Sequence, residues 1–102
     1  MIELEFKNHG SLLYHIENAG PTKIKVDFYD KDYVTNPEDY VIIKNIYYKD
    51  LILPELFEFT TMTTDNDEYA NLSNVNYVSF NGTWKLNFTE EDIKKILKRK
   101  LT

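Results

Sequence analysis

The chain has 102 residues, a formal net charge of −5 from 12 Lys and Arg against 17 Asp and Glu, and a hydrophobic share of 42%. This length and composition indicate one folded domain over residues 1–102 and exclude a two-domain or disordered protein. The absence of cysteine excludes disulfides, thiolate metal sites and a cysteine nucleophile. The start of the chain predicts no secretion signal, and no apolar run reaches the roughly 18 residues of a membrane span. We therefore expect a cytoplasmic protein.

Three alternating segments near the start of the chain predict the first three strands. Each segment places an apolar residue at every second position, which is the period of a strand with one buried face. The apolar positions are Ile2, Leu4 and Phe6, then Leu12, Tyr14 and Ile16, and finally Ile24, Val26 and Phe28. Turn-forming residues at Asn8–Gly10 and Asn18–Pro21 separate the segments, so we expect antiparallel neighbours joined by short turns.

The middle of the chain predicts two β-rich runs after a polar connection. The connection spans Asp30–Asp39, and the runs are Tyr40–Lys49 and Leu51–Thr64. Apolar residues at helical spacing make a short helix over Pro54–Phe59 an alternative, although the aromatic residues and threonines favour a strand. The polar stretch Asp65–Asn74 is expected to be a loop.

The segment Val75–Phe88 carries the strongest local signal, because Asn81-Gly82 is typical of a two-residue type I′ hairpin turn. In the resulting hairpin, Val78 and Phe80 would lie on one face and would need a cover. The opposite face would be the core face, formed by Val75, Tyr77, Trp84, Leu86 and Phe88.

Residues 89–101 predict a C-terminal helix. Thr89 is a favourable N-cap, and Asp92 stands at the spacing of a capping box. Acidic residues in the first turn and basic residues in the last turn suit the helix dipole. One apolar stripe directs the helix onto the sheet, and it consists of Ile93, Ile96, Leu97 and Leu101.

Together these elements predict an α+β fold, with strands over residues 1–88 and the helix over residues 89–101. We expect a mainly antiparallel sheet, or a small curved barrel, of six or seven strands with the helix packed on it. In the order of its elements, this arrangement resembles the pleckstrin-homology-like domains. The resemblance covers element order and implies an architecture alone.

The residue types that perform catalysis or bind metals form no recognisable constellation. His9-Gly10-Ser11 indicates a polar turn, because residues this close along the backbone cannot form a catalytic triad. The stretch Asp65–Glu68 begins like a calcium loop, but Ala70 replaces the required glycine and Asn76 the closing glutamate. We therefore expect a protein that is not an enzyme and has no catalytic residue, no cofactor and no metal.

Negative charge is concentrated in two acidic clusters, the first within residues 27–39 and the second within residues 50–84. Residues 1–88 hold 7 cations and 14 anions, whereas residues 89–102 hold 5 cations and 3 anions. Lys31 is the only cation within residues 27–39, and residues 50–84 contain none. Such a field repels nucleic acid and attracts basic protein surfaces, and tyrosine is enriched at interfaces. The candidate partner-binding residues are Asp27, Tyr29, Asp30, Asp32, Tyr33, Glu38, Asp39, Asp65, Asp67, Glu68 and Tyr69.

The charge map predicts a small acidic module that binds a protein partner with a basic surface. We expect an inhibitor that occludes a nucleic-acid-binding surface. Eleven Lys against one Arg, with ten Asn and nine Ile, is typical of an AT-rich genome. The concrete hypothesis is therefore an anti-defence protein of a phage or mobile element, of the anti-CRISPR or anti-restriction type.

The sequence leaves open whether the basic face of the C-terminal helix has a ligand, such as nucleic acid or a membrane, and it is also compatible with two other functions. One is an immunity protein that neutralises a basic toxin, and the second is a structural subunit of an oligomer or virion, paired through edge strands or through Val78 and Phe80. Acidic residues also serve ordinary solubility, and the helix dipole accounts for the basic residues of the helix. We expect no direct nucleic-acid binding and no membrane binding, because the acidic body opposes the approach of phosphates.

Overall fold

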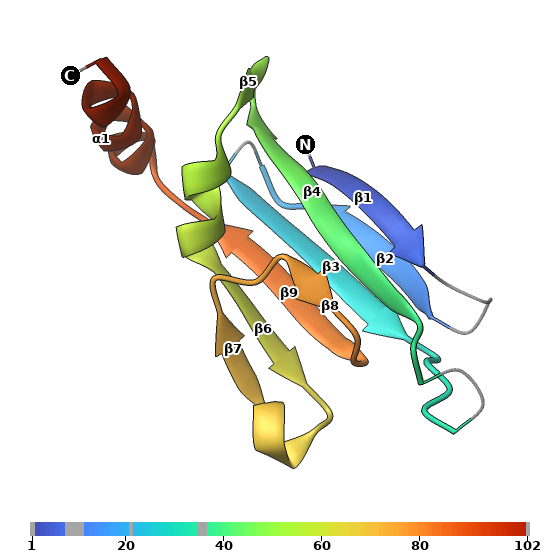
Figure 1. Cartoon of the computed structure of the whole chain (residues 1–102). Helices are drawn as coiled ribbons and strands as arrows, with labels where there is room; N and C mark the ends of the chain where they lie inside the picture. Colours follow the sequence, from blue (N-terminus) through green and yellow to red (C-terminus); the bar gives the residue numbers. More distant parts are fainter. Residues whose placement is uncertain (1, 8–11, 21, 35–36, 102) are drawn as a thin grey trace.

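Two antiparallel sheets enclose one hydrophobic core in the computed structural model of the chain (Figure 1). The structure describes residues 2–7, 12–20, 22–34 and 37–101, and for Lys7, Asp67 and Leu101 it describes the backbone alone. The turn predicted at Asn8–Gly10 lies outside the described residues, and so does Ser11.

The first sheet is organised by β4, its longest strand. Its members are β1 (Ile2–Lys7), β4 (Tyr40–Tyr48), β5 (Leu51–Ile52) and β8 (Tyr77–Val78). β1 pairs with β4 in antiparallel register, with a bulge between Glu3 and Leu4. β5 and β8 each add two residues to β4, at opposite ends of that strand. Val41 and Ile43 are buried in the first half of β4, and Ile46 and Tyr48 in the second half. The alternation changes phase at Lys44, where the register with β1 shifts, so each half has one face on the core.

The second sheet has the order β2-β3-β9-β6-β7. Its members are β2 (Leu13–Asn18), β3 (Lys23–Tyr29), β9 (Gly82–Asn87), β6 (Thr60–Thr64) and β7 (Asn71–Ser73). In the central strand, Trp84 stands opposite Val26 on one side and Met62 on the other. All three side chains are at most 1% exposed, so this row forms the centre of the core.

The three strands predicted over the first 29 residues are confirmed as elements, and β2 and β3 are antiparallel neighbours as expected. The expected pairing of the first two strands is wrong, because β1 pairs with β4. The buried face expected for the second strand is also wrong, because all six residues of β2 are exposed and the buried Leu12 precedes the strand.

The second β-rich run is interrupted by a helix, contrary to the strand favoured from its sequence. Residues Pro54–Phe59 form a 3₁₀ helix, η1, with the proline in its first turn. Leu53 and Leu56 are both buried, and a single helical turn places them on the same side. Proline also lacks the N–H that a sheet ladder requires. Core burial therefore overrides the β propensity of the aromatic residues.

The predicted loop over Asp65–Asn74 contains regular structure. Asp67–Tyr69 form a short 3₁₀ helix, η2, capped by the Asn66 side chain, which accepts a hydrogen bond from the backbone N–H of Glu68 at 2.9 Å. β7 then pairs with β6 as the outer strand of the second sheet. Polar composition predicted a loop because edge strands with polar faces carry little hydrophobic signal.

The predicted hairpin around Asn81-Gly82 is wrong. β8 pairs with β4 in the first sheet, whereas β9 pairs with β3 and β6 in the second, so the chain crosses between sheets. Val78 is buried at 1% exposure and Tyr77 is 51% exposed, which reverses the faces expected for them. Gly82 is required by close approach, since a Cβ there would overlap the Thr63 carbonyl oxygen.

The C-terminal helix is confirmed as α1 (Glu90–Leu101). The backbone N–H of Thr89 donates to Asp92 Oδ2 at 2.7 Å, and that of Asp92 donates to Thr89 Oγ1 at 3.1 Å. This reciprocal pair is the predicted capping box. Ile93 and Ile96 are buried in the core, and the Tyr48 hydroxyl donates to Glu90 Oε2 at 2.6 Å. The helix therefore packs at one end of the sheets (Figure 1).

The expected α+β fold, with mainly antiparallel strands and one helix packed on them, is confirmed. The sheets remain open, because β2 and β7 end the second sheet and β1 ends the first among the described residues. The alternative of a closed barrel is therefore wrong. The described chain has nine strands where six or seven were expected, and the short β5, β7 and β8 account for the difference. No helix among the described residues has the length and apolarity to cross a membrane.

Candidate functional site

Lys31 is the organising residue of the first acidic cluster. Its side chain is 7% exposed, and its ammonium group donates to the backbone carbonyls of Pro37 at 3.0 Å, Asp39 at 2.7 Å and Ser79 at 2.5 Å. Its backbone N–H donates to Asn81 Oδ1 at 2.8 Å. One side chain therefore holds the connection after β3 against the segment between β8 and β9.

Burial lowers the pKa of the Lys31 ammonium, and the nearby carboxylates of Asp39 and Glu38 act in the opposite direction. Removing an ammonium group from water is costly unless its protons are hydrogen-bonded, and here three carbonyls accept them. The only cation of the first acidic cluster is therefore buried and hydrogen-bonded to the backbone, and it is not displayed at the surface.

The Tyr33 hydroxyl connects the two acidic clusters. It donates a hydrogen bond to Asp65 Oδ1 at 2.8 Å and accepts one from the backbone N–H of Asn81 at 2.7 Å. The backbone N–H of Asp65 donates to the Asn81 carbonyl at 3.2 Å. Burial is the main cause that raises the pKa of Tyr33, the Asn81 N–H lowers it, and Asp65 raises it. The hydroxyl therefore stays protonated at neutral pH and can donate to the carboxylate.

Phe80 adds an aromatic contact to the same junction. Its ring centroid lies 5.6 Å from that of Tyr69 in a stacked arrangement and 6.3 Å from that of Tyr33 in a tilted one. The two tyrosines are 46% and 40% exposed. They thus form a supported aromatic surface, where contact area is presented with little loss of side-chain entropy on binding.

We define the acidic end as this aromatic surface together with the exposed acids beside it. Asp30, Glu38 and Glu68 are exposed, and none of them forms a hydrogen bond through its carboxylate or a salt bridge with a described residue. The segments that carry them lie toward the lower end of the sheets in Figure 1. The members of the acidic end are Asp30, Tyr33, Glu38, Asp65, Glu68 and Tyr69.

Five other predicted residues have different positions. Asp27 lies within β3, where Oδ1 accepts the Thr83 hydroxyl at 2.8 Å, and Tyr29 ends that strand with 43% exposure. Asp32 Oδ1 accepts the backbone N–H of Val34 at 2.9 Å within its loop. Asp39 is fully buried, and its backbone carbonyl accepts a hydrogen bond from the Lys31 ammonium. Because a buried residue cannot contact a partner, Asp39 is removed from the candidate surface. The side chain of Asp67 lies outside the part of the chain that the structure describes.

Sequence reasoning missed Lys31, Phe80 and Asn81 as parts of this site. Lys31 carried a usable signal, because it was the only cation in an otherwise acidic stretch. Phe80 also carried one, as a large apolar residue placed on the polar face of the expected hairpin. Asn81 was assigned to a local turn, and its hydrogen bonds with Tyr33, Lys31 and Asp65 are all long-range.

The described residues contain no group of three or more His, Asp or Glu side chains arranged to hold a metal ion. What the acidic end offers chemically is negative charge, hydrogen-bond acceptors and aromatic faces on a fixed support. Comparisons of the chain with models of protein families, with curated proteins and with solved structures found no match. The function is therefore inferred from the geometry of this site.

Proposed function

We propose that this chain is a small non-enzymatic protein-binding module whose acidic end covers a basic, nucleic-acid-binding surface of a partner and thereby inhibits it. One observation carries the proposal. The Tyr33 hydroxyl joins two acidic segments that are 32 residues apart, and it fixes them beside exposed aromatic rings. A fixed arrangement of charge and aromatic surface binds with a smaller entropy cost than mobile loops.

Electrostatics supports a basic partner. Asp30, Glu38 and Glu68 present carboxylates without a cation within salt-bridge distance in the described part of the chain, while Lys31 is buried. Complementary charge accelerates association with a cationic surface and disfavours nucleic acid. Carboxylates beside aromatic rings can occupy the positions that phosphates and bases take on such a surface.

The amino-acid usage supports the biological setting. A chain rich in Lys, Asn and Ile fits a phage or mobile element of a low-GC bacterium, and the inhibitor then acts in the cytoplasm of the host. An anti-CRISPR or anti-restriction protein would target a defence nuclease. An immunity protein would use the same acidic end against a basic toxin, and the identity of the captured partner distinguishes the two.

The proposal is tested by capture from a lysate of a low-GC Gram-positive host with three tagged baits. The first bait is the wild-type chain and the second carries Glu38→Lys and Glu68→Lys at the acidic end. The third carries Glu5→Lys and Glu58→Lys, two exposed acids elsewhere, so it has the same net charge as the second. Bound proteins are identified by mass spectrometry at about 0.1 M and about 0.5 M salt, since salt screens such contacts.

We expect one basic protein in stoichiometric amount on the wild-type and control baits at low salt. The acidic-end variant should lose it, and the higher salt should release it from the other two. The same proteins on all three baits would contradict the proposal, because the contact would then be independent of the acidic end. No partner on any bait, with self-association of the chain, would contradict it as well.

A second candidate function is a structural subunit, and one observation favours it. All six residues of the outer strand β2 are exposed, including Leu13, Tyr14 and Ile16, and the Tyr14 ring lies 5.0 Å from that of Phe6. Exposed apolar edge strands pair readily with other chains. The face around Val78, which was the other expected assembly surface, is buried against β4. A discrete multimer by native mass spectrometry would support this candidate, and a monomer would exclude it.

A further inference from the structure

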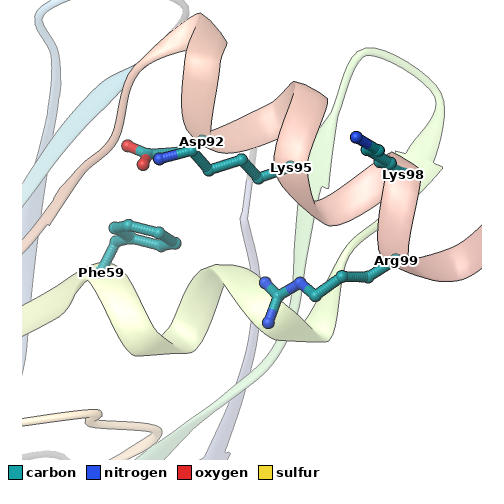
Figure 2. Close-up of a pocket in the computed structure, with 5 residues that line it drawn as sticks. All are labelled: Phe59, Asp92, Lys95, Lys98 and Arg99. Carbon is teal, nitrogen blue, oxygen red and sulfur yellow. The ribbon is translucent and has the colours of Figure 1, made fainter.

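A pocket lies between α1 and η1, away from the acidic end (Figure 2). Its volume is about 550 Å³, within the range of small-molecule sites. Four of its lining residues come from successive turns of α1, and the fifth, Phe59, is the last residue of η1. The lining residues are Phe59, Asp92, Lys95, Lys98 and Arg99.

The pocket is cationic although the protein as a whole is acidic. On the same helix, Lys94 pairs with Glu91 at 3.4 Å and Lys100 reaches Glu55 at 3.0 Å. Lys95 and Lys98 form no hydrogen bond or ion pair with any residue that the structure describes. Lys95, Lys98 and Arg99 therefore line a shared space to which Asp92 contributes a carboxylate, and Arg99 also acts on the nearby Glu55, whose pKa it lowers.

The helix dipole accounts for only part of this arrangement. It favours cations in the last turn, where Lys98, Arg99 and Lys100 stand. Lys95 lies in the middle of the helix, where the dipole effect is weak, and yet it lines the same pocket. Phe59 packs against the hydrophobic core and is partly buried, and it also lines the space beside these cations.

The two ends of the pocket differ in chemistry. Figure 2 shows Phe59, Asp92 and the amine end of Lys95 at one end, with Lys98 and Arg99 toward the other. An aromatic ring face is a stacking surface for a planar ligand. Asp92 Oδ2 accepts from Thr89, and Oδ1 remains an acceptor for a hydroxyl or amino group. The cations at the far end suit phosphate oxygens, which accept charge-assisted hydrogen bonds.

We infer that this pocket binds a small phosphate that carries an aromatic ring, the chemistry of a mononucleotide. The ring stacks on Phe59, the linking hydroxyls lie near Asp92 and Lys95, and the phosphate is held by Lys98 and Arg99. This site is independent of the acidic end, and its ligand is a small molecule. The acidic body of the protein still repels a long polyanion.

The inference is tested by titrating the ¹⁵N-labelled chain with AMP, adenosine and inorganic phosphate, and following backbone amide shifts by NMR. AMP should shift Phe59 and the amides of residues 92–99, and it should bind at least about tenfold more tightly than either half alone. Equal affinities for AMP and phosphate, or shifts spread over lysines throughout the chain, would overturn the inference.

Variants of the pocket test which residues bind the phosphate and which bind the ring. The double variant Lys95→Gln and Lys98→Gln should weaken AMP binding about tenfold or more, because two charge-assisted contacts are lost. The matched control carries Lys44→Gln and Lys85→Gln, two exposed lysines on the sheets, and should bind AMP as the wild type does. Phe59→Leu should reduce the preference for AMP over phosphate, with its amide spectrum confirming the fold. Equal weakening in both double variants would overturn the inference.

A single-stranded DNA decamer distinguishes a free nucleotide from a polymer end. We expect it to bind no more tightly than AMP, because its other phosphates meet the acidic body of the protein. Binding more than about tenfold tighter than AMP, with a steep dependence on salt, would overturn the mononucleotide assignment in favour of a nucleic-acid site.

Discussion

The Tyr33 hydroxyl donates to Asp65 Oδ1 at 2.8 Å and thereby ties the connection after β3 to the end of β6. Asn81 completes the junction, because its backbone N–H donates to the same hydroxyl at 2.7 Å. Three segments that are distant in the sequence therefore share one phenol oxygen. The shape of the acidic end depends on this contact.

Removing that hydroxyl should weaken the junction without removing its aromatic ring. We expect Tyr33→Phe to lower the free energy of unfolding by about 1 kcal/mol, because a carboxylate and a backbone N–H each lose a partner. Tyr29→Phe is the matched control, since Tyr29 is similarly exposed, and it should change stability by less than about 0.5 kcal/mol. Urea unfolding followed by Trp84 fluorescence measures both. Equal effects of the two variants would contradict the role of the hydroxyl.

Lys31→Met tests the buried ammonium group. Methionine keeps most of the side-chain length but leaves three carbonyl acceptors, on Pro37, Asp39 and Ser79, without their donor. We expect a loss of about 3 kcal/mol in the free energy of unfolding. Lys44→Met, at an exposed position of β4, should change it by less than about 0.5 kcal/mol. A loss below about 1 kcal/mol for Lys31→Met would show that the carbonyls find other partners.

Local periodicity predicted the strands where neighbouring residues decide the structure. β1, β3 and β4, the alternation within β9 and the capped helix α1 all follow from spacing and capping. The prediction that Trp84 and Leu86 lie on the buried face of their strand is confirmed. Residues at every second position of a strand share one face, so the apolar pair had to face the core together. The acidic character of the site was also visible, since charge is read directly from composition.

Long-range contacts decided the features that sequence reasoning missed. Asn81-Gly82 satisfies the local rule for a hairpin turn, but Asn81 is bound by Lys31, Tyr33 and Asp65, and β8 pairs with β4. A rule based on two residues contains no information about such partners. The burial of Lys31 likewise involves the segment between β8 and β9, because its ammonium donates to the Ser79 carbonyl, 48 residues away.

The crossing of β8 between the sheets gives a direct test of the topology. Val78→Ala removes buried methyl groups and should lower the free energy of unfolding by about 2 kcal/mol. Tyr77→Ala removes an exposed ring that contacts Tyr40 at a centroid distance of 4.9 Å, and should cost about 1 kcal/mol or less. The hairpin expected from the sequence would place Tyr77 on the core face, and it therefore predicts the larger loss for Tyr77→Ala. A larger loss for Tyr77→Ala would contradict the observed pairing.

Glu55 should make a small, pH-dependent contribution to stability. A hydrogen bond from its own backbone N–H lowers the pKa of Glu55, burial raises it, and Lys100 lowers it further. A carboxyl with a lowered pKa stabilises the fold above its unfolded value of 4.5, and this contribution is lost as the pH falls through the folded pKa. Both partners are partly exposed, so the effect is about 0.5 kcal/mol.

The comparison of wild type with Glu55→Gln isolates this contribution, because all other acids titrate in both proteins. Urea unfolding at about pH 7 should find the wild type more stable. The difference should shrink as the pH falls through the folded pKa of Glu55, since the protonated glutamic acid is neutral like glutamine. A difference that stays constant as the pH is lowered would contradict the lowered pKa of Glu55, to which its backbone N–H and Lys100 contribute.

Occlusion of a nucleic-acid-binding surface is tested most directly by competition. The captured basic partner is mixed with a fluorescent oligonucleotide that it binds, and the anisotropy is followed while the wild-type chain is added. We predict complete release of the oligonucleotide at one chain per partner, and no release by the variant with Glu38→Lys and Glu68→Lys. An oligonucleotide that remains bound while the chain binds the same partner, in a ternary complex, would contradict the proposed occlusion.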